Sequence, residues 1–196
     1  MDEIFFSTDI EADGRIPGPN SLLSFALVAM TADKKLLGTF NANLETLPDA
    51  TQEKENKAWW NTQPHAWAAC RSDQEHPRAA LNRCLQWVQS FDGVPIFVAA
   101  PGGFDFMWMH WYFIRFLGTS PFGLRLLDMR SFLMGQRGCA FGAAGISSLP
   151  AWMSEGLPHT HVALDDAMKQ CAIFGNMLED NRAGRAGGQN GHRESA

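Results

Sequence analysis

Two carboxylates near the start of the chain, Asp9 and Glu11, lie two residues apart at the end of the apolar run "EIFFSTD". Alternate residues of an extended strand point to the same face, so this spacing places both side chains together. Two like charges side by side repel unless one is protonated or a cation lies between them. The pair therefore predicts either a solvated strand end or a cation site.

A third carboxylate, Asp105, is the only formally charged residue between Asp92 and Arg115, inside the aromatic run "GGFDFMWMHWYFI". A buried, unpaired carboxylate costs several kcal/mol, so Asp105 must be neutral, paired or at a functional surface. One interpretation is a helix-start carboxylate that the macrodipole stabilises by about 0.3 to 1 kcal/mol. The other is a functional group, because a helix start that follows a strand is where α/β sites gather.

The segment "LPHTHVALDDAMKQ" contains two histidines, His159 and His161, and two adjacent aspartates. On a helix with 100° per residue, Asp165 falls on the same flank as Lys169, which predicts an ordinary exposed ion pair. Asp166 falls on the opposite flank, among apolar residues and without a basic partner on its helix. Asp166 therefore needs a counter-charge from elsewhere, and a metal ion is a natural one. Helix geometry does not choose between the two histidines.

Hydrophobic periodicity predicts the elements that must position these groups. We expect strands at 3–9, 21–30, 35–44, 94–100 and 124–129. We expect helices within 53–91, with a break near Pro64 and a new start at His76–Pro77, and at 103–117 and 161–180. This order indicates an α/β fold with a mixed sheet and helices on its faces. We expect one domain at 1–181 and a disordered, Gly-rich tail at 182–196.

Composition excludes several classes of protein. The chain has 196 residues, a formal net charge of −5 and no run of Lys or Arg, which argues against binding long duplexes. Its four cysteines form no zinc-type cluster, and GxGxxG, GxxxxGK, HExxH and GxSxG motifs are absent. The first residues lack the pattern of a signal peptide or membrane span. We therefore expect a cytoplasmic protein without a membrane segment.

Taken together, "FFSTDIEADG", "GGFDF" and "HVALDDA" resemble the three motifs of the DEDD (DnaQ-like) 3'-5' exonuclease superfamily, histidine subtype. The third matches that subtype's His-x-Ala-x-x-Asp. The motifs occur in the expected order and context, and the resemblance covers roughly residues 3 to 180. It implies a ribonuclease H-like fold, a five-stranded mixed β-sheet flanked by α-helices.

The resemblance also implies a metal site. Carried over to this chain, Asp9, Glu11 and Asp166 would ligate one divalent ion, Asp9 would bridge to a second, and Asp105 would complete the site through water. Oxygen ligands of this kind suit Mg²⁺ or Mn²⁺. Two such ions about 4 Å apart can activate a water molecule and stabilise the leaving oxygen of a phosphodiester.

The family spacing assigns the remaining roles. His161, five residues before Asp166, would be the general base, and His159 is left as a loop residue. The motifs also indicate a substrate-binding group: Ala12, Gly14 and Phe104.

Two features bear on how substrate is held. Pro101 occupies the position where the family often has Asn or His, which removes a polar group and a backbone donor from the strand-to-helix turn. Trp59, Trp60 and Trp67 could stack on bases, but core packing is the commoner fate of large aromatic side chains.

The resemblance implies a 3'-5' exonuclease that acts on single-stranded 3' ends and releases nucleoside 5'-monophosphates. RNA is slightly favoured, by analogy with stand-alone relatives, and a DNA exonuclease of proofreading or repair type is the alternative. A catalytically inactive nucleic-acid-binding scaffold is a third hypothesis, which the presence of all five polar residues disfavours. Dimers occur in the family, so a homodimer stays open.

Overall fold

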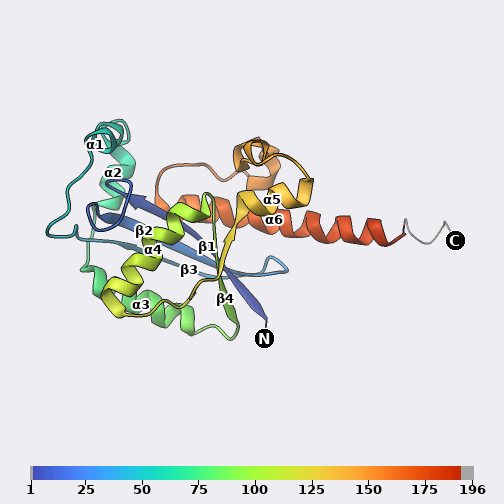
Figure 1. Cartoon of the computed structure of the whole chain (residues 1–196), viewed down its shortest axis with the longest axis horizontal. Helices are drawn as coiled ribbons and strands as arrows, with labels where there is room; N and C mark the ends of the chain where they lie inside the picture. Colours follow the sequence, from blue (N-terminus) through green and yellow to red (C-terminus); the bar gives the residue numbers. More distant parts are fainter. Residues whose placement is uncertain (1, 191–196) are drawn as a thin grey trace.

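A five-stranded mixed sheet forms the centre of the computed structural model, which describes residues 2 to 190 (Figure 1). Its spatial order is β3-β2-β1-β4-β5. The strands are β1 (Glu3–Ala12), β2 (Leu22–Thr31), β3 (Leu36–Asn43), β4 (Val94–Ala99) and β5 (Leu126–Asp128). The first three pair antiparallel, whereas β4 pairs parallel with both β1 and β5. The predicted five-stranded mixed sheet is confirmed.

Helices cover both faces of this sheet. They are α1 (Lys54–Trp60), α2 (Pro64–Cys70), α3 (Pro77–Gln89), α4 (Gly102–Leu117), α5 (Met129–Arg137) and α6 (Ala163–Asn190). Short 3-10 helices lie at Phe141–Ala143, Ile146–Ser148 and Ala151–Ser154. One apolar core joins α3 and α4 to the sheet, and a second joins α5 and α6 to the other face. Within residues 2 to 190, no helix combines the length and apolarity that a membrane span requires.

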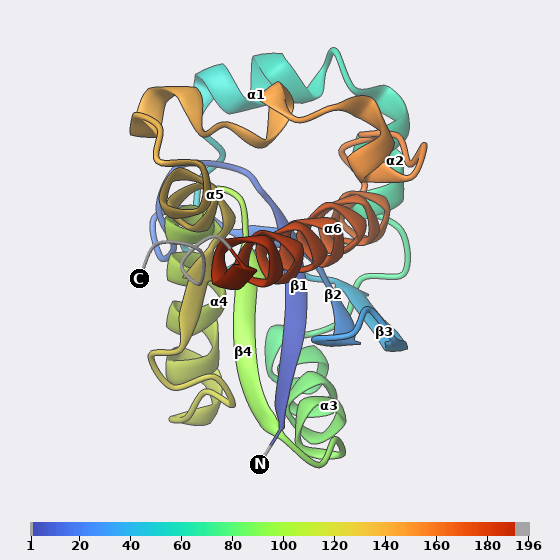
Figure 2. The ribbon, with the colours of Figure 1, turned by 90° about the vertical axis from the view of Figure 1, so that its right-hand side faces the viewer.

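The helix breaks follow the sequence signals. Pro64 and Pro77 each open a helix, at positions where a missing N–H costs nothing. Gly118 ends α4 in the left-handed conformation, with φ of 74°. Helix α5 and the 3-10 helices were not predicted. In Figure 1 and Figure 2 the segment between α5 and α6 lies above α6.

Strand β1 determines which face the first two carboxylates occupy. Phe6 points into the core beneath α3 and α4, whereas the Ser7 hydroxyl donates to the Ala167 carbonyl of α6 at 2.9 Å. Because side chains alternate along a strand, Asp9 and Glu11 share the face of Ser7 and point toward α6. The strand also continues past the predicted end at residue 9, so both carboxylates lie within it.

Helix α6 is the longest element and extends beyond the rest of the fold in Figure 1. It begins at Ala163, two residues after the predicted start, and continues to Asn190, into the segment 182–196 that we expected to be a disordered tail. Near its end, the Arg182 guanidinium donates to the Ala32 carbonyl at 2.7 Å. Residues 191–196 lie outside the described part of the chain.

Candidate active site

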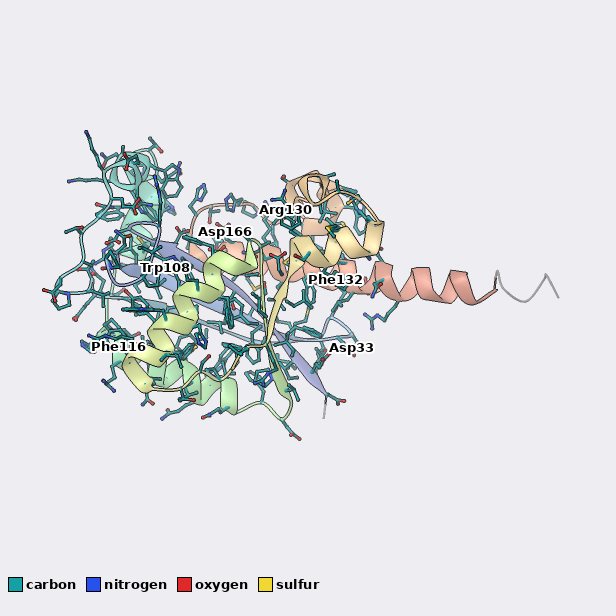
Figure 3. All side chains as sticks on the ribbon, viewed as in Figure 1. Asp33, Trp108, Phe116, Arg130, Phe132 and Asp166 are labelled. Carbon is teal, nitrogen blue, oxygen red and sulfur yellow. The ribbon has the colours of Figure 1, made fainter. Side chains whose placement is uncertain are left out.

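Three carboxylates from β1 and α6 converge at one end of the sheet. Oxygen atoms of Asp9, Glu11 and Asp166 all lie within 4.8 Å of one another. Asp9 is partly buried, whereas Glu11 and Asp166 are only 8% and 2% exposed. Asp166 lies close to the start of α6, and in Figure 3 it is labelled beside the N-terminal end of α4. The alternation of β1 and the first turn of α6 therefore bring together residues that lie more than 150 positions apart.

Asp105 enters the same site from the first turn of α4. The parallel pairing of β1 with β4 ends at Ser7 and Val98, so that edge of β1 is unpaired beyond this point. There the backbone N–H of Ile10 donates to the Asp105 carboxylate at 3.2 Å. Asp105 is 4% exposed. The structure thus brings all four predicted acidic residues to one place.

The four carboxylates lack sufficient positive charge. Burial raises the pKa of Glu11 to about 9, with further contributions from the charges of Asp166 and Asp105. Burial also raises the pKa of Asp105 to about 8. The pKa of Asp9 is held well above its ordinary value, first by burial and then by the other three carboxylates. Among the ion pairs of residues 2 to 190, no Lys or Arg contacts any of the four.

Asp166 organises the segment that precedes α6. Its two oxygens accept hydrogen bonds from the backbone N–H groups of Thr160 and His161, each at 2.9 Å. His159 Nδ1 lies 2.8 Å from Asp166 Oδ1. The His161 ring lies edge-to-face against Trp59, with 4.9 Å between centroids, and its residue has a φ of 59°. Both histidines therefore lie beside the carboxylates, and proximity alone does not choose between them.

Asp165, by contrast, is not part of the carboxylate cluster. It is exposed and accepts a hydrogen bond from the Thr160 hydroxyl at 2.8 Å. The predicted ion pair with Lys169 is wrong: it is not among the ion pairs of the described residues. The reason is local, because the loop before α6 offers Asp165 a nearer partner than the lysine one turn along.

A cavity of about 550 Å³ opens beside the carboxylates. Asp9 and Asp166 form its polar end, together with His159, Lys169 and Gln170. The opposite wall is mainly apolar and comes from the 3-10 segment at 146–154. Of these polar residues, the sequence did not predict His159, Lys169 or Gln170 as part of the site. Only Gln170 carried a signal, because it falls on the same helix flank as Asp166.

The strand-to-helix turn at Pro101 is held by side chains from outside the turn. The Ala100 N–H donates to the Gln170 side-chain oxygen, and the Gly102 N–H donates to the Asp128 carboxylate, each at 2.8 Å. Asp128 also caps α5. These two hydrogen bonds hold the turn although Pro101 stands where Asn or His was expected.

The predicted substrate-binding residues lie around the site but differ in character. The Ala12 carbonyl accepts a hydrogen bond from the indole of the buried Trp60 at 3.1 Å. Gly14 packs so tightly against Asn20 that an added Cβ would lie 2.1 Å from its side chain. Phe104 is 37% exposed and directly precedes Asp105. Packing therefore explains Gly14, while Phe104 presents an accessible ring.

The chain matches no protein-family model, but it is similar to a curated protein from Escherichia coli, the 3'-5' DNA exonuclease Cap18. The two are 28% identical over 176 residues, which cover 88% of this chain and 90% of the relative.

Solved structures share the fold. The nuclease domain of 3'hExo, a DEDDh family member bound to rAMP, superposes with a TM-score of 0.66 at 12% identity, over 91% of this chain and 92% of its own. E. coli Exonuclease I with a dT13 oligonucleotide gives 0.67 at 15% identity, over 92% of this chain but 42% of its own. S. pombe Pop2p, in its Mg²⁺- and Mn²⁺-bound form, gives 0.63 at 12% identity, over 90% of this chain and 84% of its own. These comparisons confirm the ribonuclease H-like fold and the predicted class of enzyme, a 3'-5' exonuclease.

Proposed function

We propose that this chain, which has the fold of the DEDDh exonucleases, is a divalent-metal-dependent enzyme that removes nucleoside 5'-monophosphates from the 3' end of single-stranded nucleic acid. The observation that carries the proposal is the convergence of Asp9, Glu11 and Asp166 within 4.8 Å, with Asp105 against the same strand. Buried acids without a lysine or arginine partner are stable together only if protons or cations neutralise them.

The donor set fits Mg²⁺ or Mn²⁺. It consists of carboxylate oxygens, the ligands that these hard cations prefer. Asp9, Glu11 and Asp166 would hold one ion, and Asp9 would be shared with a second. Asp105 would complete the site through water. When bound, the ions would lower the pKa of a water molecule and stabilise negative charge on the phosphate and on the leaving 3' oxygen. The Mg²⁺- and Mn²⁺-bound form of Pop2p, which has the same fold, supports this choice.

His161 would accept the proton of the attacking water. Burial, followed by the neighbouring His159, lowers its pKa from the ordinary 6.5, so the imidazole is neutral at pH 7 and can accept a proton. Trp59 restrains the ring, and the hydrogen bond from the His161 N–H to Asp166 fixes the base relative to a proposed metal ligand. His159, whose Nδ1 lies 2.8 Å from Asp166 Oδ1, would then help to orient that carboxylate.

DNA is the favoured substrate class. The sequence relative is a DNA exonuclease, and one structural neighbour was solved with a dT13 oligonucleotide. The slight RNA preference drawn from family analogy is untested, and the sequence relative favours the DNA alternative. The acidic chain favours short or single-stranded substrates over long duplexes.

The proposal is tested with matched DNA and RNA oligonucleotides, labelled at the 5' or the 3' end and incubated with Mg²⁺ or Mn²⁺. We expect shortening from the 3' end, faster on DNA, that EDTA abolishes. Asp166→Asn should eliminate activity, whereas the exposed Asp165→Asn should retain most of it. Loss of activity in the Asp165 variant alone, or degradation that persists in EDTA, would contradict the assignment.

A further inference from the structure

One buried amide links the three catalytic segments of the fold. Gln170, one turn after Asp166 on α6, is 5% exposed. Its Nε2 donates to Asp9 Oδ1 at 2.8 Å, and its Oε1 accepts from the Ala100 N–H at 2.8 Å. Ala100 begins the turn that leads to Asp105. Gln170 therefore contacts β1 and the end of β4 from α6, beside the carboxylates rather than among them.

The chemistry of the two partners fixes how this amide is oriented. A backbone N–H can only donate, so the side-chain oxygen must face Ala100. The NH₂ group must then face Asp9, and the reverse orientation would pair donor with donor. A glutamine suits this place because it donates to Asp9 without adding charge. A lysine would compete with a cation for Asp9, and a glutamate would add a fifth carboxylate to the cluster.

We infer that Gln170 is a positioning residue for the metal site: it fixes the rotation of the Asp9 carboxylate and the distance between β1 and the Asp105 turn. This inference rests on the proposed function. Side chains that orient metal ligands typically contribute 10- to 100-fold to metal affinity or activity. Gln170 needs no contact with substrate to do so.

The same helix provides a matched control. Asn176 is also 5% exposed, and its amide also bonds in both directions: it donates to the Met153 carbonyl at 2.8 Å and accepts from Lys34 Nζ at 2.7 Å. It contacts none of the four carboxylates among its hydrogen bonds. Asn176→Leu therefore measures what the loss of a buried amide on α6 does to folding alone.

Mn²⁺ binding by calorimetry tests the inference, with thermal unfolding and kcat measured alongside, on the full chain. We expect Gln170→Leu and Gln170→Met, which leave Asp9 Oδ1 without this donor, to weaken Mn²⁺ binding by about 10- to 100-fold. Asn176→Leu should lose stability yet bind Mn²⁺ like the wild type. If the Gln170 variants bound Mn²⁺ within twofold of wild type, Gln170 would be structural only. If the wild type itself bound no Mn²⁺, the proposed function would fail first.

A second set of residues lies along one flank of α4. On a helix with 100° per residue, Phe104, Trp111 and Arg115 fall within about 20° of one direction. Phe104 lies next to Asp105, and Arg115 lies about 16 Å further along the axis. This row leads from the carboxylates to the far end of the helix, where Phe116 is labelled in Figure 3.

A cleft of about 590 Å³ lies at that far end. It is lined by Trp111, Arg115 and Phe116 of α4, by His76 and Arg78 at the start of α3, and by the loops at 18 and 47–49. Neither Arg78 nor Arg115 takes part in an ion pair among residues 2 to 190. Asp49 is the one acidic residue of the cleft. Two guanidinium groups that form no ion pair within the described residues therefore lie beside an indole, on a chain of net charge −5.

The geometry points to this row and cleft as the path of the single strand that precedes the cleaved nucleotide. The guanidinium groups would neutralise phosphates, while Phe104 and Trp111 would stack on bases, which is worth about 1–3 kcal/mol per base. This inference also rests on the proposed function, and it concerns longer substrates only.

Oligonucleotide length distinguishes this path from the cleavage site. We expect the double variant Arg78→Glu/Arg115→Glu to raise KM at least tenfold for a 15-nucleotide strand, with kcat and the KM of a dinucleotide unchanged. Its salt dependence should also fall, because each phosphate contact to a single strand contributes about 0.7 to the slope. Arg137→Glu, at an exposed arginine in the last turn of α5, is the control for charge reversal at a single surface site. An equal rise in KM for the 15-nucleotide strand and the dinucleotide would contradict the proposed path. So would an equal rise in KM in the Arg137→Glu control.

Discussion

Glu11→Gln offers a test of the carboxylate cluster that does not depend on activity. Without metal, burial and the neighbouring acids raise the pKa of Glu11 from an ordinary 4.5 to about 9. Below pH 4.5 the side chain is protonated in both the folded and unfolded states. As the pH rises toward 9, the unfolded state ionises while the folded state keeps its proton, so stability falls. At pH 7 this difference amounts to about 3 kcal/mol.

Glutamine has the same shape and cannot ionise, so the substitution should remove that cost. In EDTA at pH 7 we expect Glu11→Gln to unfold at a temperature roughly 6 to 12 °C above the wild type, a difference that vanishes near pH 4.5. Mn²⁺ should stabilise the wild type at pH 7 and stabilise the variant much less. Calorimetric or spectroscopic melting curves in both conditions measure this.

The exposed Asp165→Asn variant serves as the control and should match the wild type in both conditions. The opposite result is that Glu11→Gln is no more stable than the wild type in EDTA and gains as much stability from Mn²⁺. That result would mean that Glu11 is already compensated within the protein and does not face a cation.

Four further outcomes follow from the contacts in and around the site. His161→Ala should lower kcat on labelled oligonucleotides by about 10²- to 10⁴-fold, and His159→Ala should lower it much less. A larger loss in His159→Ala would mean that His159, not His161, is the general base. Because the pKa of His161 is lowered from 6.5, wild-type activity should decline only below that pH. Tyr112→Phe should cost about 1–3 kcal/mol in urea unfolding, since the Tyr112 hydroxyl accepts the N–H of the first residue of β2 at 2.7 Å. Gly14→Ala should speed proteolysis of the 13–21 loop, because the methyl group would displace Asn20; an unchanged rate of proteolysis would mean that the loop adapts freely.

The sequence alone predicted the acids well, because each lies at a position that strand or helix periodicity defines. Two-residue spacing placed Asp9 and Glu11 on one face, and the helix wheel separated the buried Asp166 from the exposed Asp165.

Other contacts could not be read from periodicity, since they join segments far apart in the chain. Gln170 reaches Asp9 and Ala100, and Asp128 reaches Gly102; each distance depends on how the sheet and helices pack. Helix α5 did carry local signals, an Asp128 cap and a closing glycine at 138 with φ of 61°. At nine residues it was too short for its apolar pattern to predict a helix.

The unequal lengths of β1 and β4 have a wider consequence. Strand β4 ends at Ala99, while β1 runs on to Ala12, so the sheet has a notch on one side of β1. Asp105 reaches Ile10 only because no neighbouring strand occupies that notch. A chain that kept every acidic residue but extended the pairing of β1 with β4 would fill this notch. Asp105 could then no longer reach Ile10, and the carboxylate cluster would be lost. Strand length, as much as residue identity, is therefore what divergent copies of this fold must preserve to remain enzymes.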